Sequence, residues 1–532
     1  MSGTFDPDRI PTPESSRRFP AEKYLYRRQY VMAPEPVRPY GNWETREVSR
    51  DLILSHHPDL EVTVVDGGRA RLVLLGHILD PSHPRRSNRQ ILASLARNEE
   101  FESVLAGSAA FGGRWAIVWV GANGVRAFHD ATGARQIYFA GHSGSVLCAS
   151  QPHLIGHLLG LSPDQDPVVD RYVRSRVYRE HERPWAGDSS PVAGVRHLLP
   201  NRWLDLNSAR AVRYWPCGPL PEPHAAARVE SSCEMLRGML KATAHRFSPM
   251  LAVTAGWDSR VLLAASRGMQ EEFTYFIHKS GGCTERHRDL KAARALAEHL
   301  GLDLKVIAVD EEVPEDFTRL FRLSVAVHQT DSKIPLHYNF ASEFEGRVFV
   351  SGNASEVARG YYGWPRGVDA RRLAGFWGAR GAEAEFLVRE FDSWFREARE
   401  PCERSGVAVT DLFYWEQRMG NWGAMYCADS DIAVEVVWPF NCRRLLEILL
   451  SAPRERRAKP HHRLYVEIIE NLWPGALRIP LNDLPVYGAR KWTHRFRNLD
   501  SNDCRRVAAR VLPYVPSPLL SCYRRAKHWL WS

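Results

Sequence analysis

The sequence predicts a mixed chain, in which an α+β part built on antiparallel strands precedes an α/β part built on a doubly wound parallel sheet. Short apolar segments separated by glycine-containing turns recur between residues 62 and 149, which is typical of antiparallel strands. After a proline-rich segment at 216–224, apolar segments alternate with helical ones, which is typical of a parallel sheet. The length of 532 residues allows for two or three domains.

The composition excludes several classes of protein. Hydrophobic residues make up 44% and charged residues 25% of the chain, near the globular average, which excludes a disordered chain or a fibre. No apolar run is long enough for a transmembrane segment. A net charge of +9, spread along the chain, does not predict a nucleic-acid partner. Nine cysteines without a CxxC pair indicate reduced thiols and a cytoplasmic protein.

The first half of the chain is expected to hold an arm and one domain. Residues 1–45 are rich in proline, arginine and tyrosine and are expected to form an extended arm, and residues 46–215 are expected to form the antiparallel domain. One helix is predicted at 89–105. Strands are predicted at 62–65, 71–75, 115–120, 125–129, 137–140 and 146–149.

The second half is expected to follow an extended linker at 216–224, because prolines disfavour packed structure there. The α/β domain is expected over 225–495, largely helical beyond residue 370. Its predicted elements are helices at 226–246, 261–268 and 289–301 and strands at 250–254, 273–278, 304–309 and 347–350. Residues 496–532 form a basic tail, interpreted as a docked helix, with an acidic partner or a membrane surface as alternatives.

The segment that follows the strand at 250–254 has the features of a pyrophosphate-binding loop. Small residues at a strand-to-helix turn let backbone N–H groups approach an anion, and the next helix adds positive dipole character. Asp258 carries the kind of carboxylate that magnesium prefers. The predicted ligand-binding residues are Thr254, Ala255, Gly256, Asp258 and Ser259. An ordinary helix start, capped by Asp258 or Ser259, is an equal alternative for this loop alone.

A second loop of the same kind follows the strand at 347–350. Ser351 and Gly352 are small, and Glu356 supplies a second carboxylate. Ligands of a doubly wound sheet bind at the carboxyl ends of its strands, so we expect the two loops to converge on one nucleotide. The sequence therefore predicts that Asp258 and Glu356 hold magnesium, and that Ser351 and Gly352 contact the nucleotide.

These segments resemble motifs of the asparagine synthetase B-type superfamily, which includes β-lactam synthetase and the lasso-peptide cyclases. The family's S-G-G-x-D-S loop corresponds to residues 254–259, and its S-G-E-G-A-D-E-L-F-G-G-Y segment corresponds to residues 351–362. Asp289 and the segment EVVWPF at 435–440 match two further elements, although the arginine of the second is absent. The resemblance implies an ATP-pyrophosphatase domain.

The first half resembles the glutaminase domain of the same family, which implies an Ntn-type sandwich. The matching segments are GGRWAIV at 112–118, FHDATGARQIY at 128–138 and GVRHLLP at 194–200. In that family a cysteine directly after the initiator methionine attacks glutamine. Ser2 stands in that place here, and the first cysteine is Cys148. The domain is therefore expected to be a degenerate glutaminase that releases no ammonia.

Two further departures concern catalysis. Asn353 stands in the catalytic region where relatives carry a Glu or a Tyr, and an amide cannot act as a general base. The family's late lysine is absent from its usual neighbourhood. Lys491 is the candidate replacement, with Arg490 as an alternative.

The resemblance implies an ATP-dependent ligase, without glutamine hydrolysis, that acts in the biosynthesis of a specialised metabolite or modified peptide. A small-molecule or peptide carboxylate attacks the α-phosphate of ATP, pyrophosphate leaves, and an amine attacks the acyl-adenylate to give an amide and AMP. ATP and Mg²⁺ are the expected cofactors, and Asp258, Glu356 and Lys491 the expected catalytic residues. An adenylating enzyme with a water or thiol acceptor and a nucleotide-binding pseudoenzyme stay open, as do a partner protein and a homodimer.

Residues 414–422 mix aromatic and charged side chains at helical spacing. They are interpreted as a helix packed on the core, with Glu416 and Arg418 as solvated charges. A role of these two side chains in an acceptor pocket is the alternative.

Overall fold

The computed structural model describes residues 6–13, 16, 18–98, 100–180, 182–279, 285, 287–325 and 327–481. Residues Met1–Ala476 form one unit and Leu477–Ser532 form a second. The candidate lysine Lys491, its alternative Arg490 and the tail predicted at 496–532 lie outside the described residues. In the described part of the chain, none of the helices combines the length and the apolarity needed to cross a bilayer.

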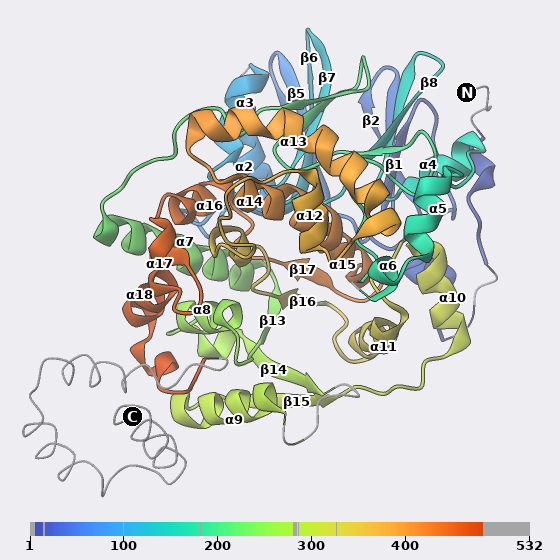
Figure 1. The fold of residues 1–532 in the computed structure, drawn as a ribbon. Coiled ribbons are helices and arrows are strands. Elements are labelled where there is room, and N and C mark those ends of the chain that lie inside the picture. Colours follow the sequence, from blue (N-terminus) through green and yellow to red (C-terminus); the bar gives the residue numbers. More distant parts are fainter. Residues whose placement is uncertain are drawn as a thin grey trace, which may run out of the picture. The chain divides into compact units, whose positions relative to one another are not determined.

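The first half folds into two six-stranded antiparallel sheets that share one apolar core (Figure 1). One sheet has the order β10-β8-β9-β1-β3-β2, with β1 (Tyr30–Ala33), β2 (Glu44–Ser49), β3 (Leu52–His56), β8 (Tyr138–His142), β9 (Ser145–Ala149) and β10 (Arg196–His197). The other has the order β12-β11-β7-β6-β5-β4, with β4 (Val62–Gly67), β5 (Ala70–Leu79), β6 (Gly112–Gly121), β7 (Gly124–His129), β11 (Arg202–Asp205) and β12 (Arg210–Arg213). The helices of this half are α1 (Ala21–Tyr24), α2 (Asn88–Leu95), α3 (Phe101–Ser108), α4 (Pro152–Leu159), α5 (Pro167–Arg174) and α6 (Arg176–Glu180).

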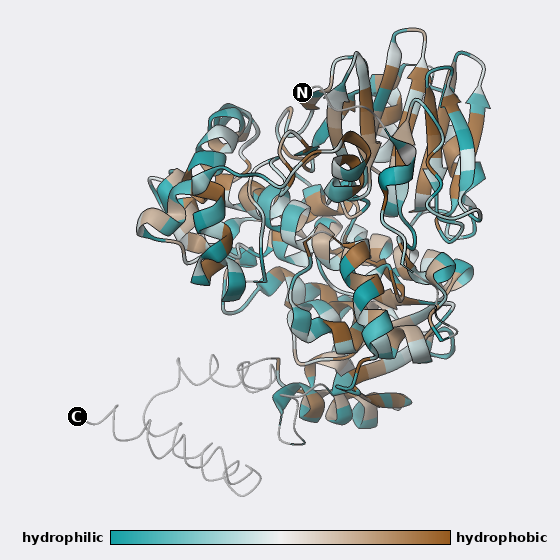
Figure 2. Ribbon diagram, turned by 90° about the vertical axis from the view of Figure 1, so that its right-hand side faces the viewer, coloured by the Kyte–Doolittle hydropathy of each residue, from teal (hydrophilic) through white to brown (hydrophobic). Residues whose placement is uncertain are grey.

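Strand β5 explains why the sheets are covered on both faces. Val73 and Leu75 point into the core between the sheets, whereas Leu72 and Leu74 belong to a second core under α2 and α3. Alternate residues of a strand point to opposite faces, so the apolar run from Leu72 to Leu75 needs a cover on each side. Figure 2 shows hydrophobic residues in brown along these strands. Helix α4 packs against β8 and β9 of the other sheet.

The single helix predicted at 89–105 is wrong, because two helices, α2 and α3, occupy this segment. The apolar spacing that ends at Leu95 is interrupted at the polar Asn98 and restarts at Phe101. Each helix therefore buries its own apolar residues against the same sheet, which one continuous helix with this spacing does not allow.

The second half contains a five-stranded parallel sheet with the order β15-β14-β13-β16-β17. Its strands are β13 (Ser248–Ala252), β14 (Thr274–Lys279), β15 (Leu304–Ala308), β16 (Arg347–Val350) and β17 (Glu435–Val437). Helix α7 (Ala225–Arg246) precedes the first of them, and the helices between them are α8 (Trp257–Ala265), α9 (Arg288–Leu300), α10 (Glu315–Ser324) and α11 (Ile334–Glu343). After β13 the chain adds β14 and then β15 on one side of it. It then returns to place β16 and β17 on the other side, so the direction of winding reverses between β13 and β16.

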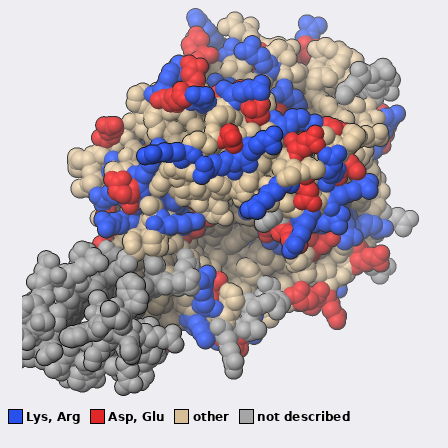
Figure 3. Space-filling view, in the orientation of Figure 1, with Lys and Arg blue, Asp and Glu red and all other residues tan. Residues whose placement is uncertain are grey.

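The rest of the described chain is mainly helical. It comprises α12 (Ala370–Phe376), α13 (Glu385–Ser405), α14 (Val409–Phe413), a π-helix (Tyr414–Gly423), α15 (Ala424–Ser430), α16 (Arg443–Leu450), α17 (Arg454–Arg457) and α18 (Arg463–Leu472). Basic and acidic side chains intermingle on the face seen in Figure 3. On α13 they pair one helical turn apart, as Arg399 does with Glu403 at 2.9 Å.

The extended arm predicted over residues 1–45 is also corrected. Residues 30–33 form β1, an inner strand between β9 and β3. The segment before β1 packs against two helices of the second half: the Phe19 ring makes edge-to-face contacts with Phe317 of α10 and Tyr338 of α11. Aromatic residues that read as an exposed, proline-interrupted arm therefore belong to the core.

A buried network of charges joins the sandwich of two sheets to the parallel sheet. Arg114 of β6 donates to both carboxylate oxygens of Asp431, at 2.5 and 2.7 Å. Arg135 donates to Glu435 at 2.7 Å, and Arg28 lies 3.2 Å from the same carboxylate. All five side chains are largely buried. Removing one partner from such a network leaves charge without compensation in the interior, which is strongly destabilising.

We expect Glu435→Gln to lower the free energy of unfolding by about 3–5 kcal/mol at neutral pH. Burial alone raises the pKa of Glu435, but Arg135 and Arg114 outweigh burial and the net pKa shift is downward. A carboxyl with a lowered pKa in the folded state stabilises the fold above its unfolded pKa of about 4.3, and this contribution is lost as the pH falls. Urea unfolding should be measured at pH 7 and between pH 5 and 3. The free energy of unfolding should fall less steeply with decreasing pH in the variant than in the wild type. Glu180→Gln, which removes an exposed pair with Arg176, is the control and should cost about 0–1 kcal/mol.

Candidate functional site

The two predicted loops follow the two strands between which the sheet reverses its winding. Strands β13 and β16 are hydrogen-bonded neighbours. Residues 254–259 follow β13 and open α8, and residues 351–362 follow β16. In doubly wound sheets ligands bind at this point, beyond the carboxyl ends of the two strands. The topology therefore brings both loops to the same place.

The first loop is shaped by its own hydroxyl groups. The hydroxyl oxygens of Thr254 and Ser259 are 2.7 Å apart and hydrogen-bonded, and the Gly256 N–H donates to Thr254 Oγ1 at 3.1 Å. Helix α8 begins at Trp257 with Gly256 as its N-cap and no side-chain cap. The alternative of a helix start capped by Asp258 or Ser259 therefore does not describe this turn.

Asp289 fixes the first loop from the side. Its carboxylate accepts a hydrogen bond from the backbone N–H of Ala255 at 3.0 Å, and it lies in the first turn of α9. The side chain is partly exposed. The acidic residue at the start of α9 thus contacts the loop, and the Ala255 N–H is already paired.

The second loop is tied to β17 and approaches the first. The backbone N–H of Ser351 donates to the Val437 carbonyl at 3.1 Å. A Cβ at position 352 would lie 2.5 Å from the Cβ of Asp258 and 2.8 Å from its carbonyl carbon. Gly352 therefore lets the two loops touch, and Asn353, whose backbone N–H donates to Ser351 Oγ at 3.4 Å, completes the turn.

Asp258 and Glu356 meet at one guanidinium. Nη2 of Arg359 lies 2.8 Å from Asp258 Oδ2 and 3.3 Å from Glu356 Oε1. The Ser355 hydroxyl donates to the other oxygen of Asp258. Ser355, Glu356 and Arg359 belong to a 3₁₀ turn (Ser355–Ala358) and its C-cap. Sequence reasoning missed Arg359, although a basic residue three positions after an acidic one on a helical turn is a signal of pairing.

The charges of this group do not balance. Burial raises the pKa of Asp258 and the Glu356 carboxylate raises it further, against the opposing effect of Arg359. Burial lowers the pKa of Arg359, but the two carboxylates outweigh burial, so the net pKa shift of Arg359 is upward. One guanidinium therefore faces two carboxyl groups. The raised pKa of Asp258 shows that these two groups favour additional positive charge, either a proton or a bound cation.

The acidic pair fits a divalent ion that is shared with a ligand. Oε2 of Glu356 is buried and has no hydrogen-bond partner among the described residues, which is the kind of oxygen that a magnesium ion would take. Within the described ranges no three His, Cys, Asp or Glu side chains form a metal-binding group. Magnesium is commonly held by one or two carboxylates together with phosphate oxygens and water, so two carboxylates suffice when the ligand is a phosphate.

Aromatic side chains surround the turn that carries Glu356. The Tyr465 hydroxyl donates to the Ser355 carbonyl at 2.7 Å, and the rings of Tyr361 and Tyr414 are 4.9 Å apart. Lys459 places its ammonium group 4.8 Å from the centre of the Tyr361 ring. Tyr361 is one of the exposed large apolar residues. An aromatic cluster with one cation over it thus lies beside the turn of Glu356.

The interpretation of Glu416 as a solvated charge is wrong. Its side chain is fully buried in the π-helix and forms a bidentate pair with Arg213. Trp394 also donates to it, at 2.7 Å. Arg418 packs over the Trp422 ring at 4.0 Å and is partly buried. Glu416 thus serves packing between the two halves of the chain.

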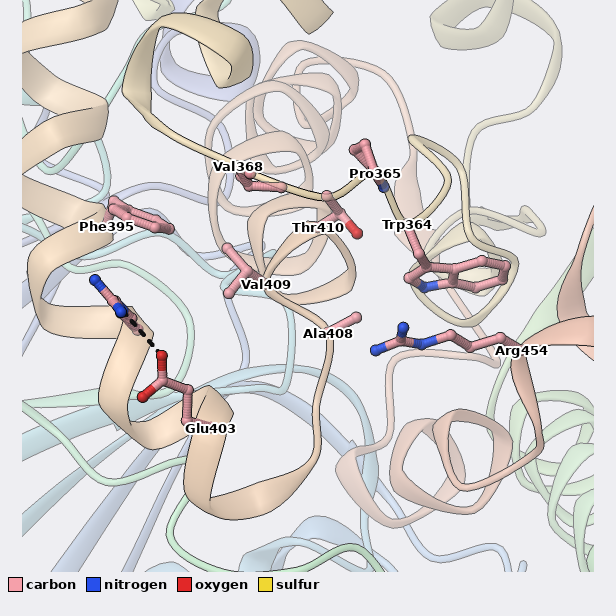
Figure 4. Close-up of a pocket in the computed structure, with 11 residues that line it drawn as sticks. Trp364, Pro365, Val368, Phe395, Glu403, Ala408, Val409, Thr410 and Arg454 are labelled. Atoms are coloured by element: carbon pink, nitrogen blue, oxygen red, sulfur yellow. Dashed lines mark hydrogen bonds and ion pairs between the residues drawn. The ribbon is translucent and has the colours of Figure 1, made fainter.

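A separate cavity of about 490 Å³ is lined by residues that follow the second loop, among them Trp364 and Pro365 (Figure 4). Trp364 lies at its edge and also packs against Gly360 of the loop. The other side chains that Figure 4 labels are mostly apolar, apart from Thr410, Glu403 and Arg454. None of the predicted site residues lines this cavity among the residues that the structure describes.

Comparisons with known proteins give no family. No family model matches the chain, and no curated protein matches it. Among solved structures 26 chains match. One is glutamine phosphoribosylpyrophosphate amidotransferase from B. subtilis complexed with ADP and GMP, at 10% identity over 62% of this chain and 70% of that chain, with a TM-score of 0.24. Another is described as the allosteric regulatory enzyme of purine biosynthesis, at 11% identity over 57% and 75%, with a TM-score of 0.25. At such TM-scores the likeness supports no conclusion about this chain.

We expect Gly352→Ala to push the second loop away from Asp258, because the added methyl group overlaps the backbone of that residue. The cost in unfolding free energy should be about 1–3 kcal/mol. Gly375→Ala on α12, where nothing lies within 4 Å of an added Cβ, is the matched control and should be neutral or stabilising. Thermal unfolding of both variants tests this packing, and equal melting temperatures would contradict it.

Proposed function

We propose that the protein is an ATP-dependent, AMP-forming carbon–nitrogen ligase of the asparagine synthetase-like type. The observation that supports this best is the meeting of Asp258 and Glu356 from the two loops that follow β13 and β16. A nucleotide whose phosphates lie over these loops would have backbone N–H groups at the start of α8 beside it, together with two carboxylates for a shared ion.

The proposed reaction has two steps. An oxygen of the substrate carboxylate attacks the α-phosphate, and the bond to the β-phosphate breaks to release pyrophosphate. An amine nitrogen then attacks the acyl carbon, AMP leaves, and the amine loses a proton. Asp258 and Glu356 would hold magnesium, which neutralises charge on the leaving pyrophosphate, and the loop at 254–259 would bind that group. Fixed dipoles that stabilise developing charge commonly contribute more to such catalysis than any other effect.

The sandwich is proposed to be an Ntn-type domain without glutaminase activity. Its first strand, β1, begins at Tyr30, and the segment before it packs against α10 and α11 through Phe19. A packed segment therefore precedes that strand, and Ser2 stands where the resembled family has its nucleophilic cysteine. Cys148 is buried in β9, and burial raises the pKa of its thiol. The amine must then come from a substrate.

A second candidate function is nucleotide binding without catalysis, in a scaffold or partner subunit. The guanidinium of Arg359 between the two carboxylates favours it, because this cation already neutralises part of the charge that a metal ion would neutralise. Binding of ATP without release of pyrophosphate would support this alternative. An adenylating enzyme whose acceptor is water or a thiol would release pyrophosphate and give an acid or a thioester, which mass spectrometry of the product identifies.

ATP–pyrophosphate exchange, screened over a panel of carboxylic acids with and without amines, tests the proposed ligase. With a productive acid, Asp258→Asn should lower the exchange rate by about 10²–10³-fold, since the variant loses a group that stabilises the leaving pyrophosphate. Glu383→Gln, an exposed acidic residue outside both loops, serves as control and should exchange like the wild type. Near-wild-type exchange by Asp258→Asn would remove this residue from the mechanism.

Glutamine should not serve as nitrogen donor. We expect no glutamate to be released when the protein is incubated with glutamine, ATP and its carboxylic acid, whereas an added amine supports amide formation. Enzymatic assay of glutamate and mass spectrometry of the amide measure the two outcomes. Glutamate release that depends on ATP and the acid would show that the sandwich retains a nucleophile.

A further inference from the structure

The Arg359 guanidinium lies where the proposed function places a divalent ion. A single nitrogen, Nη2, contacts the carboxylates of both Asp258 and Glu356. A metal ion and a guanidinium repel each other strongly at such short range, because the interaction of like charges scales inversely with their distance. A divalent ion that binds these carboxylates must therefore displace the guanidinium.

At least one further nitrogen of the guanidinium can form a new bond. Nε of Arg359 is buried and has no hydrogen-bond partner among the described residues. The residue ends a short 3₁₀ turn and precedes Gly360, whose φ of +56° suits glycine. The Arg359 side chain also lies over the Tyr465 ring, at 5.8 Å. Its planar array of N–H donors matches the oxygens of a phosphate group.

We propose that Arg359 is an exchangeable counter-ion of the site. In the metal-free protein it neutralises part of the charge of the acidic pair, and when a divalent ion takes the carboxylates it passes to the phosphates of the nucleotide. This inference rests on the proposed function and adds Arg359 as a nucleotide-binding residue. Metal binding alone has to displace Arg359, whereas the phosphates give it a new partner. Each ligand therefore strengthens the binding of the other, and such coupling is reciprocal.

The test is a titration with Mn²⁺, a spectroscopically visible substitute for Mg²⁺, in which free Mn²⁺ is measured by electron paramagnetic resonance. Arg359→Gln should bind Mn²⁺ alone at least about tenfold more tightly than the wild type. The gain in Mn²⁺ affinity that inorganic pyrophosphate provides should fall by at least about tenfold in the same variant. Arg371→Gln, an exposed arginine on α12, is the matched control and should behave like the wild type. Arg359→Lys keeps the charge and should bind Mn²⁺ alone as weakly as the wild type.

The outcomes separate this inference from the proposed function. Suppose that Arg359→Gln and the wild type bind Mn²⁺ equally, and that Asp258→Asn abolishes the binding. The metal site is then supported, and the proposed role of Arg359 as a counter-ion that the metal displaces is overturned. If neither the wild type nor Arg359→Gln binds Mn²⁺ or pyrophosphate, the proposed function is overturned as well. Circular dichroism establishes that each variant is folded. Should Arg359→Gln fail to fold, Arg359→Lys tests whether Arg359 passes to the phosphates. Lysine lacks the planar donor array, so pyrophosphate should increase the Mn²⁺ affinity of this variant less than that of the wild type.

Discussion

The close approach of Gly352 to Asp258 determines the geometry of the candidate site. Only a residue without a side chain lets the turn after β16 come near enough for Ser355 and Arg359 to bond the Asp258 carboxylate. Charge gives an attraction between Asp258 and Arg359 of the second loop, but Glu356 of the same loop repels Asp258 and opposes it. Packing between two backbones therefore holds two like charges side by side, and Arg359 offsets only part of their repulsion.

The acidic pair costs folding stability, and this cost is consistent with a role in ligand binding. A buried carboxylate oxygen without a partner, such as Oε2 of Glu356, costs on the order of 1–3 kcal/mol. Proteins tend to keep such unfavourable groups where a bound ligand offsets the cost. Among the described residues, the cavity lined by Trp364 has no comparable group: Arg399 and Glu403 pair with each other, and most of its other labelled side chains are apolar. The acidic pair is thus the better candidate for chemistry, even though it does not line that cavity.

Much of the fold could be predicted from periodicity, and the misses have physical causes. The strands from Val62 to Ala149 and the alternation after residue 225 follow from apolar patterns and glycine turns. Strands β1 to β3 were missed because residues 30–56 mix apolar residues with proline, arginine and tyrosine, and their burial depends on pairing with β9 and on packing against the other sheet, both far away in sequence. The loops of the site were predictable from their small residues. The burial of Glu416 and the contact of Arg359 with Asp258 were not, because a charged side chain reads as solvated until its distant partner is known.

The sandwich has a structural part in the site even without a reaction of its own. Arg114 and Arg135 come from the sandwich and neutralise Asp431 and Glu435, and Glu435 is the first residue of β17. The last residue of that strand, Val437, accepts the hydrogen bond of the Ser351 N–H. A continuous set of contacts therefore runs from the sandwich through β17 to the second loop. If the sandwich has no glutaminase activity, as proposed, it would still support the second loop through these contacts.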